Sequence, residues 1–293
     1  MKRLLVTGGS GLVGGHIIRQ ARGKWEVHGT FYRNGVCFDH AMMHRVSLSD
    51  ESSARSLIQS VRPHVIIHTA AWTDVDGCEK KPELARQINF ISTEWIAQEA
   101  AALSARLIYL SSDMVFDGLK GAYRENDAPC PVNIYGRTKK EGEDAVLGYH
   151  PSAVVARVAL VYGQPVHQGN SFSGRILEKA RQGESVSLYT DQYRSPVWVN
   201  NLAEALLELA VLPFGGIIHL GGPDRINRFI FGQYLIRKAG CSEDLLIPVS
   251  MFDAAPFASR PQDASFNIRK AQDLLKTRLT GYRESIDLMF PVM

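Results

Sequence analysis

The sequence predicts an α/β fold, in which a doubly wound parallel sheet is joined to a smaller, mixed α/β region toward the C-terminus. Two observations support this prediction. Short runs rich in β-branched residues alternate with longer helical patterns through the first half of the chain, which is typical of βαβ units and a parallel sheet. A glycine-rich turn also joins the first predicted strand to the first predicted helix.

The elements of the first half follow one another without a linker or an internal repeat. The predicted strands cover 3–8, 25–32, a short stretch that ends before Asp50, 64–71, 106–112 and 153–163. The predicted helices cover 14–23, 50–63, 82–103 and 133–146. Asp50 precedes the second of these helices, and we expect its side chain to cap the helix N-terminus.

The pattern changes after Gly163. Helical patterns at 171–183 and 200–211 alternate with strand patterns at 185–198 and 216–222, and a last helical pattern lies at 267–276. We therefore predict a first domain over residues 1–163, to which strands near 186–222 return. Residues 164–293 are predicted to form mainly the second, substrate-binding region.

Composition excludes several classes of function. The chain has 293 residues and a formal charge of only +3, without a block of Lys and Arg interleaved with aromatic residues, so we expect no nucleic-acid partner. Its four cysteines form no C-x-x-C pair, which favours neither a zinc site nor a disulfide framework. No run of about 18 apolar residues and no signal peptide is present, so we expect no membrane association and a cytoplasmic location.

The glycine turn "VTGGSGLVGGH" predicts a dinucleotide site. It places Gly8, Gly11 and Gly14 between a strand and a helix. In such a turn the first glycine permits a tight bend, the second lets the backbone approach a pyrophosphate, and the third lets helix and strand pack closely. The phosphates then lie at the helix N-terminus. Residues 1–163 are therefore predicted to be a Rossmann domain.

The end of the second strand indicates which dinucleotide is bound. An NAD-specific site places Asp or Glu about 20 residues beyond the glycines. This chain has "FYRNG" there, and the guanidinium of Arg33 is suited to the 2′-phosphate of NADP. The alternative is a solvated arginine at a strand end. We predict NADPH as the cofactor, with NADH as the second choice.

Three side chains predict carbonyl reduction. Tyr135 and Lys139 are four residues apart, which places them on one face of a helix, and Ser112 ends a strand whose carboxyl end faces the same region. Hydride transfer to a carbonyl leaves charge on oxygen, so a proton donor must lie within hydrogen-bond reach. We expect Tyr135 to be that acid, Lys139 to lower the pKa of its phenol, and Ser112 to hold the carbonyl oxygen. Asn89 is expected to support Lys139 through water.

An isolated Tyr-x-x-x-Lys pair is more often a half-buried core tyrosine and a solvated lysine. The glycine turn upstream and the serine pair Ser111 and Ser112 between them favour the catalytic interpretation, because all three features occur in the order that a doubly wound sheet requires. Ser111 is expected to be a neighbour at the strand end. Asp113 is expected to orient the loop or to contact a substrate.

With these motifs the chain resembles the extended short-chain dehydrogenase/reductase family, and within it the dTDP-4-dehydrorhamnose reductases. The segments "DMVFDG" and "PVNIYG" are the most specific to that subfamily. Further similar segments are "TGGSGLVG", "HTAAWTDVDGCEKKPELARQIN", "ARVALVYG", "DQYRSPVWVNNLAEAL", "IIHLGG" and "RPQDASFNIRKAQDLL". The resemblance covers nearly the whole chain.

The resemblance implies NADPH-dependent reduction of the C4 keto group of a nucleotide-linked deoxysugar, and a homodimer. It implies catalytic roles for Ser112, Tyr135 and Lys139, and substrate contacts from Ser112, Asp113, Met114 and Leu160. The implied cofactor contacts are Gly8, Ser10, Gly11, Leu12, Val13, Gly14, Arg33, Ala70, Ala71, Asn89, Tyr135 and Lys139.

Three positions depart from the subfamily pattern. Met114 stands where these reductases usually have Tyr, and Leu160 stands where many have Trp near the sugar, so the sugar itself stays open. Some relatives use magnesium, but Gly15 occupies the position of the expected glutamate, and we predict no metal. His64 and His68 would lie about 13 Å apart along a strand, too far to share an ion.

Two other functions were considered. A nucleotide-sugar 4,6-dehydratase needs an acidic group after Asp113, where this chain has Met114, so that function is not favoured. An NADP-binding regulatory subunit, resembling the β subunit of methionine adenosyltransferase, has the same architecture and can keep the Tyr135 and Lys139 pair. The motif alone does not separate the reductase from the regulatory subunit.

Overall fold

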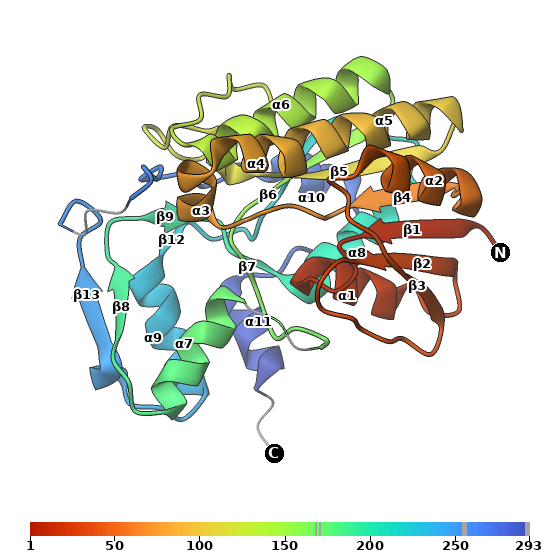
Figure 1. Ribbon diagram of the computed structural model, residues 1–293. Coiled ribbons are helices and arrows are strands. Elements are labelled where there is room, and N and C mark those ends of the chain that lie inside the picture. Colours follow the sequence, from red (N-terminus) through yellow and green to blue (C-terminus); the bar gives the residue numbers. More distant parts are fainter. Residues whose placement is uncertain (168, 170, 254–256, 291–293) are drawn as a thin grey trace.

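A computed structural model describes residues 1–167, 169, 171–253 and 257–290. Within this part of the chain, seven parallel strands form one sheet in the order β11, β6, β5, β4, β1, β2, β3 (Figure 1). The order reverses between β1 and β4, which is the switch point of a doubly wound sheet. The predicted fold class is therefore confirmed.

The sheet is built from short strands. They are β1 (Arg3–Thr7), β2 (Glu26–Phe31), β3 (Ala41–Arg45), β4 (Val65–His68), β5 (Arg106–Ser112), β6 (Val154–Val158) and β11 (Gly216–Leu220). The helices that accompany it are α1 (Leu12–Gln20), α2 (Glu51–Val61), α3 (Val75–Lys80), α4 (Pro82–Arg86), α5 (Ser92–Ala102), α6 (Ile134–Tyr149) and α8 (Val199–Leu209).

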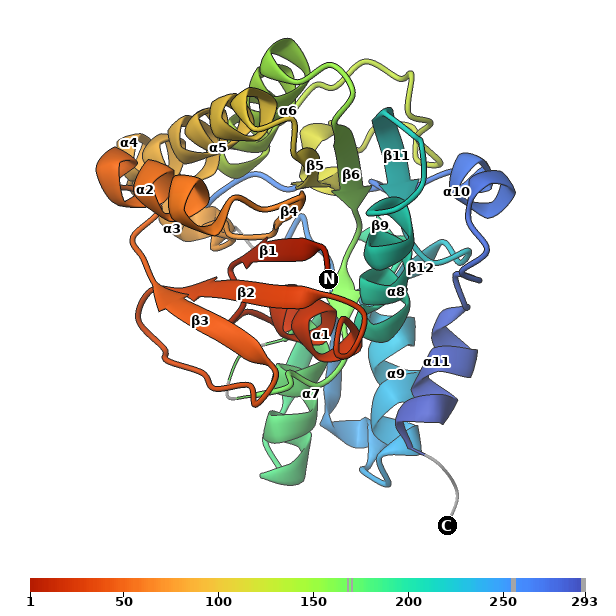
Figure 2. The same ribbon diagram turned by 90° about the vertical axis from the view of Figure 1, so that its right-hand side faces the viewer.

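Alternate residues of the central strand supply two separate cores. Leu4 and Val6 pack with residues of α1 and α8 on one face of the sheet, whereas Leu5 packs with residues of α2 and α5 on the other. Figure 2 shows the two helical layers on either side of the strands. All three of these β1 side chains are completely buried. Because both faces are covered, the strand is apolar throughout instead of alternating with polar residues.

Side-chain caps fix the starts of several helices. Asp50 accepts a hydrogen bond from the backbone N–H of Ser53 at the start of α2, as predicted. Asn133 accepts one from the N–H of Gly136 at 2.8 Å and so fixes where α6 begins. Tyr135 and Lys139 of the candidate site both lie on α6.

Some predicted elements are divided in the structure. The predicted helix 82–103 consists of α4, a π-helical turn η1 (Gln87–Ile91) and α5. The predicted strand 153–163 consists of β6 and a separate short strand, β7 (Val161–Tyr162), which pairs with β10 (Val197–Trp198). Periodicity does not detect an extra residue within a helical turn or a change of strand partner within one apolar run.

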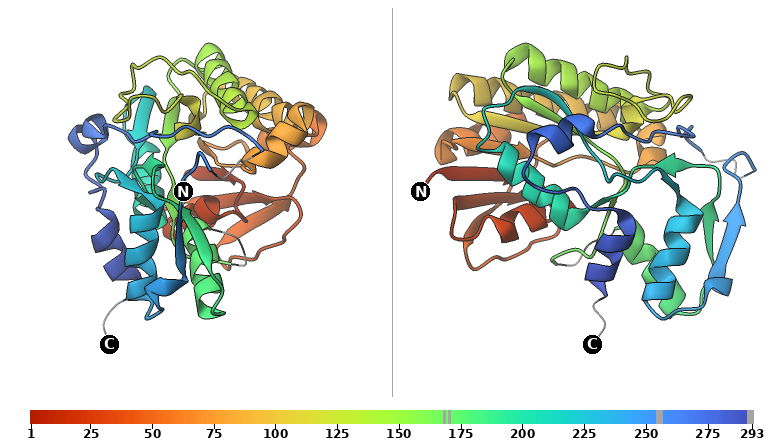
Figure 3. Two further views of the ribbon diagram at one scale, coloured as in Figure 1. Left: turned by 90° about the vertical axis from the view of Figure 1, so that its left-hand side faces the viewer. Right: turned by 180° about the vertical axis from the view of Figure 1, so that it is seen from behind.

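A second group of elements lies beyond the carboxyl edge of the sheet (Figure 3). Its strands are β8 (Val186–Tyr189), β9 (Tyr193–Arg194), β12 (Ile226–Asn227) and β13 (Leu246–Val249). Its helical segments are η2 (Asp113–Val115), α7 (Phe172–Arg181), α9 (Arg228–Lys238), η3 (Glu243–Leu245) and α11 (Tyr282–Met289). The short helix α10 (Arg269–Leu274) instead lies beside β11, and its Ala271 belongs to the core that α1 and α8 share (Figure 2). Aromatic residues Tyr162, Phe231 and Tyr282 help to form the core that α7, α9 and α11 share.

Only some of the strands near 186–222 join the large sheet. The last of them, β11, pairs with β6 and joins the large sheet, while β8 pairs with β13 outside it. The division of the chain at residue 163 remains a prediction. Among the helices of the described residues, none combines the length and the apolar character that a membrane crossing requires. Cytoplasmic placement likewise remains a prediction.

Candidate functional site

The predicted site residues follow strands that are neighbours in the sheet. Gly8 follows β1, Arg33 lies beyond β2, Ala70 lies beyond β4, Ser112 ends β5, and Leu160 lies beyond β6. Because these strands are parallel and adjacent, their carboxyl ends form one edge. The fold therefore brings the candidate cofactor and substrate residues to the same edge of the sheet.

The glycine turn is tight where helix and strand approach one another. Gly8 has a φ of +69°, and a Cβ added there would lie 2.9 Å from the backbone of Ala70. A Cβ on Gly14 would lie 2.3 Å from the carbonyl oxygen of Gly8. Gly11, in contrast, is exposed, and a Cβ there would meet only the Gly8 oxygen, at 3.2 Å. Gly8 and Gly14 thus serve the bend and the packing, while Gly11 leaves open space beside the backbone.

The start of α1 fits a pyrophosphate group. The helix has no side-chain cap and no acidic residue in its first turn, so its first N–H groups and the positive end of its dipole are open to an anion. Ser10, Leu12 and Val13 lie at this turn and are partly exposed. Arg33 is exposed beyond β2, and its guanidinium lies 5.7 Å from the ring centre of Tyr32. These residues suit a phosphorylated dinucleotide.

Ser112 and Tyr135 lie together. The pKa of the Tyr135 phenol is raised because the side chain is buried, and hydrogen bonding with the Ser112 hydroxyl lowers it in part. The Ser112 hydroxyl also donates to Asp113 Oδ1 and accepts from the Met114 N–H, at 3.1 Å each. Tyr135 packs against Met114 and Cys78. The phenol is thus protonated at neutral pH and has a hydroxyl beside it, and burial makes it a weaker acid than a free tyrosine.

Lys139 is buried one helical turn from Tyr135. Its ammonium lies 4.1 Å from the centre of the Tyr109 ring. Burial lowers its pKa to about 7, and the charge of Glu143 opposes this shift. Lys139 is not among the groups that perturb the pKa of Tyr135 in this structure. The expected lowering of the phenol pKa by Lys139 therefore remains a prediction, while burial raises this pKa.

Asn89 and His68 connect the elements around Lys139 through hydrogen bonds. Asn89, in the π-helical turn η1, accepts from the Trp72 N–H at 2.7 Å and donates to the Thr138 hydroxyl at 3.2 Å. It thereby ties the loop that contains Ala71 and Trp72 to α6, next to Lys139. The His68 ring contacts the hydroxyls of Thr7 and Thr93 at 2.6 and 3.0 Å. Burial, and secondarily the Lys139 charge, lower the pKa of His68 to about 3.

A buried ion pair fastens α6 to the sheet. Arg157 of β6 donates two hydrogen bonds to Glu143 of α6, at 2.8 and 2.7 Å, and each residue is only 1% exposed. The Ser111 hydroxyl donates to the same carboxylate. Ser111, which was expected to be only a neighbour at the strand end, is thus part of the support for α6.

A cluster of arginines next to Asp113 was not predicted from the sequence. Arg194 of β9 is buried and lies 3.2 Å from Asp113 Oδ2, and it also donates to the carbonyl of Pro261 at 2.9 Å. Arg260 forms a two-bond pair with Asp76 at 2.9 Å. Burial, and then the charge of Arg194, lower the pKa of Arg228 to about 9. No pattern in the sequence marked these arginines, because Arg194 and Arg260 lie in the polar segments "TDQYRS" and "SRPQD".

Two groups in this region lack hydrogen-bond partners among the described residues. They are Arg228 Nε and both side-chain atoms of Gln192, all of them buried. Gln192 directly precedes β9 and Arg228 directly follows β12, and Asn227 pairs with Tyr193, so both residues lie at the same end of this pair of strands. Buried donors without acceptors are costly, which favours a polar ligand at this place.

The fold and the site define a protein of the extended short-chain dehydrogenase/reductase type. The family model described as RmlD substrate binding domain matches residues 1–293, and the chain belongs to this family. A crystal structure of dTDP-4-dehydrorhamnose reductase from Bacillus anthracis in complex with NADP superimposes with a TM-score of 0.87. It is 27% identical, and the match covers 99% of each chain.

Curated relatives include proteins of two kinds. Methionine adenosyltransferase 2 subunit beta of Danio rerio is 31% identical over 99% of this chain and 91% of its own length. The probable low-salt glycan biosynthesis reductase Agl14 of Haloferax volcanii is 30% identical over 91% of this chain and 90% of its own length. The relatives therefore include both a reductase and a subunit of another enzyme.

The described residues contain no group of three or more His, Cys, Asp or Glu side chains arranged to hold a metal ion. Gly15 faces Val166, whose Cβ lies 3.5 Å from the position of an added Cβ. Independence of metal remains a prediction.

Replacing Gly14 with Ala should destabilise the protein and weaken dinucleotide binding. The new Cβ would collide with the Gly8 carbonyl, and neither backbone can move freely, so we expect the free energy of unfolding to fall by at least about 2 kcal/mol. Urea unfolding measures this change. Gly148→Ala is the control, because nothing lies within 4 Å of the new Cβ in α6. It should stabilise by about 0.5–1 kcal/mol, and similar effects of the two variants would contradict the packing role of Gly14.

Stability should fall as the pH is lowered from 7 to 5, because His68 cannot take up a proton in the folded state. Its pKa is about 3 when folded and 6.5 as a free side chain, so the unfolded chain binds the extra proton in this window. This linkage removes about 2 kcal/mol between pH 7 and pH 5. His219, with a pKa also lowered to about 3, adds to the slope. His68→Asn should therefore make the pH dependence shallower by about 2 kcal/mol, and an equal slope would refute the assignment.

Proposed function

We propose that this protein is an NADPH-dependent reductase that acts on the C4 keto group of a nucleotide-linked deoxysugar. The observation that carries the proposal is the contact between Ser112 and the protonated phenol of Tyr135 at the edge of the sheet where the glycine turn ends. The family membership and the NADP in the Bacillus anthracis structure support the choice of cofactor. NADH is the alternative cofactor in this proposal.

Bound NADPH would supply the hydride. The chain would supply the proton, from the Tyr135 hydroxyl to the oxygen of the reacting carbonyl, while Ser112 holds that oxygen by a hydrogen bond. Lys139, with a pKa of about 7, carries a partial positive charge at neutral pH. That charge would favour the phenolate that remains after the transfer, because an opposite charge nearby stabilises an anion.

The arginine cluster would recognise the nucleotide part of the substrate. Arg228 has a buried donor without an acceptor among the described residues, and Gln192 lies at the same end of the β9 and β12 pair. A diphosphate linkage supplies the acceptor oxygens that these groups lack. Asp113, paired with Arg194 and hydrogen-bonded to Ser112, would connect this cluster to the position of the reacting carbonyl. Met114 is buried, Leu160 is half-buried, and both would border the sugar.

A second function is supported by the curated relatives. The match to methionine adenosyltransferase 2 subunit beta extends over nearly the whole chain, so a regulatory subunit that binds NADP without turnover is the alternative. Its partner would be the catalytic subunit of such an enzyme. Tight NADPH binding, together with a lack of oxidation by every sugar nucleotide tested, would favour this alternative.

Tyr135→Phe should abolish most turnover and leave cofactor binding intact. Purified protein is mixed with NADPH and a panel of dTDP-4-keto-6-deoxysugars, and the loss of cofactor absorbance is followed. We expect kcat of the variant to be about 10²- to 10⁴-fold lower, because the proton donor is missing. The dissociation constant for NADPH should change by less than about threefold, since the ring that lines the site is retained.

Tyr149→Phe is the matched control for this variant. Tyr149 lies on the same helix but is 46% exposed and donates to Glu94 on the surface. Its replacement should leave both kcat and NADPH affinity unchanged. If Tyr135→Phe turned over at the rate of the control, Tyr135 would not be the acid.

Replacing Arg33 with Asp should shift the cofactor preference toward NADH. The carboxylate repels the 2′-phosphate of NADP and can accept hydrogen bonds from the ribose of NAD. The ratio of kcat/KM for NADPH to that for NADH should fall by at least about tenfold. Arg181→Asp, an exposed change at the end of α7, is the control for net charge. An unaltered ratio in the Arg33 variant would exclude its contact with the phosphate.

A further inference from the structure

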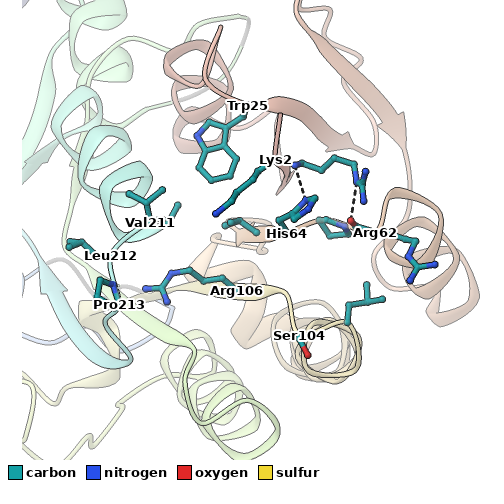
Figure 4. Close-up of a pocket in the computed structure, with 14 residues that line it drawn as sticks. Lys2, Trp25, Arg62, His64, Ser104, Arg106, Val211, Leu212 and Pro213 are labelled. Carbon is teal, nitrogen blue, oxygen red and sulfur yellow. Dashed lines mark hydrogen bonds between the residues drawn. The ribbon is translucent and has the colours of Figure 1, made fainter.

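A hollow lies at the amino ends of the strands, at the edge of the sheet opposite the one that carries the candidate active site. Figure 4 shows residues that line this hollow. Its volume is about 560 Å³, which is within the range of small-molecule sites. Arg3 begins β1, Val65 begins β4 and Arg106 begins β5, and all three line it. The length of β1, roughly 15 Å, separates this hollow from the glycine turn.

The lining is strongly basic. Of the fourteen lining residues, Lys2, Arg3, Arg62, His64 and Arg106 are basic and none is acidic. Within the described residues, none of these five takes part in an ion pair with a carboxylate. The whole chain has a formal charge of only +3, so the concentration of one sign here is local. Such a hollow attracts anions.

Several of these donors are held in place. Arg106 donates to the carbonyls of Leu209 and Phe214, at 2.7 Å each. Arg3 Nε donates to the carbonyl of Arg62 at 3.0 Å. The Arg3 backbone N–H donates to Nδ1 of His64, also at 3.0 Å, so the hydrogen of the neutral His64 ring is on Nε2 and can be donated. Figure 4 shows the side chains around the hollow, with Trp25 on one wall.

The helix dipoles account for the position of Arg106 but not for the positions of Lys2 and Arg62. The helices α2, α5 and α8 end at this hollow, and cations stabilise helix C-termini. Arg106 serves that purpose through Leu209. The side chains of Lys2 and Arg62, however, are exposed, and no hydrogen bond of theirs is present among the described residues. Their donors are available to a ligand.

Two residues at the rim of the hollow have an unfavourable backbone conformation, which is consistent with a binding role for this region. Arg62 and Ser104 have φ angles of +47° and +52°, the left-handed conformation in which glycine is favoured after a helix. Both line the hollow. A residue other than glycine costs stability in this conformation, and such costs concentrate at binding sites.

We propose that this hollow binds a small anion that carries two or more negative charges on phosphate groups. Lys2 and Arg62 would contact the phosphates from the rim, while Arg106 and the Nε2–H of His64 would contact them from the floor. Phosphate suits this set better than a carboxylate, because several convergent cations match several oxygens. Inorganic pyrophosphate and a free nucleotide share this chemistry and are distinguished by the experiment below.

The test uses protein saturated with NADPH, so that the glycine turn is not the site that is measured. Pyrophosphate, ATP and adenosine are titrated by calorimetry. We expect binding of pyrophosphate or ATP but not of adenosine. The double variant Lys2→Gln, Arg62→Gln should bind at least about tenfold more weakly, because two charge-assisted contacts are lost. Both residues are exposed, and circular dichroism checks that the variant is folded.

Arg269→Gln is the matched control, since this side chain is 85% exposed on α10, away from the hollow. It should bind as the unchanged protein does. If only pyrophosphate binds, the phosphate groups alone are recognised. If only ATP binds, the base is contacted as well, and Trp25 is the aromatic residue that lines the hollow. Equal affinity of the double variant and the control would overturn the proposal. A lack of binding of both pyrophosphate and ATP at millimolar concentration would overturn it as well.

Discussion

One buried ion pair, between Glu143 and Arg157, fastens helix α6 to the sheet. Both residues are completely surrounded by protein, and an unpaired charge in such a place costs several kcal/mol, so neither residue can move without the other. Tyr135, Lys139 and Glu143 recur every four residues and therefore share one face of α6. Fixing Glu143 against β6, and against Ser111 of β5, consequently fixes the phenol and the ammonium at the edge of the sheet. The hydrogen bonds between Glu143, Arg157 and Ser111 do not take part in the proposed reaction, but they hold Tyr135 and Lys139 in the positions that the reaction requires.

Burial has opposite effects on the two titratable groups of the candidate site. It raises the pKa of Tyr135, whose neutral form is the acid, and lowers the pKa of Lys139, whose charged form would stabilise the product phenolate. Each shift favours the neutral form, as removal from water requires. Glu143 raises the pKa of Lys139 and so keeps part of its positive charge at neutral pH. The same carboxylate therefore positions the helix and maintains the charge that the proposed reaction needs.

The sequence predicted those parts of the structure that depend on local patterns. The strand and helix alternation, the tight packing at Gly8 and Gly14 and the Asp50 cap follow from spacing and residue type within short segments. The placement of Ser112 near Tyr135 follows from the predicted fold, because the end of β5 and the start of α6 meet at the carboxyl edge of the sheet. The arginine cluster could not be predicted in this way, since Arg194, Arg228 and Arg260 come from separate segments that meet only in the folded chain. The stacking of Lys139 on Tyr109 was missed for the same reason, because it joins α6 to β5.

The two edges of the sheet have opposite backbone electrostatics, and this difference explains how each would bind an anion. At the carboxyl edge α1 begins, and its free N–H groups and positive dipole end attract phosphate without any charged side chain. At the amino edge α2, α5 and α8 end, and their carbonyls and negative dipole ends repel anions. A phosphate site at that edge must therefore be built from cationic side chains. These cations have to offset the negative ends of the helix dipoles and also bind the phosphate. The convergence of Lys2, Arg3, Arg62 and Arg106, without a single carboxylate in the lining, meets this requirement.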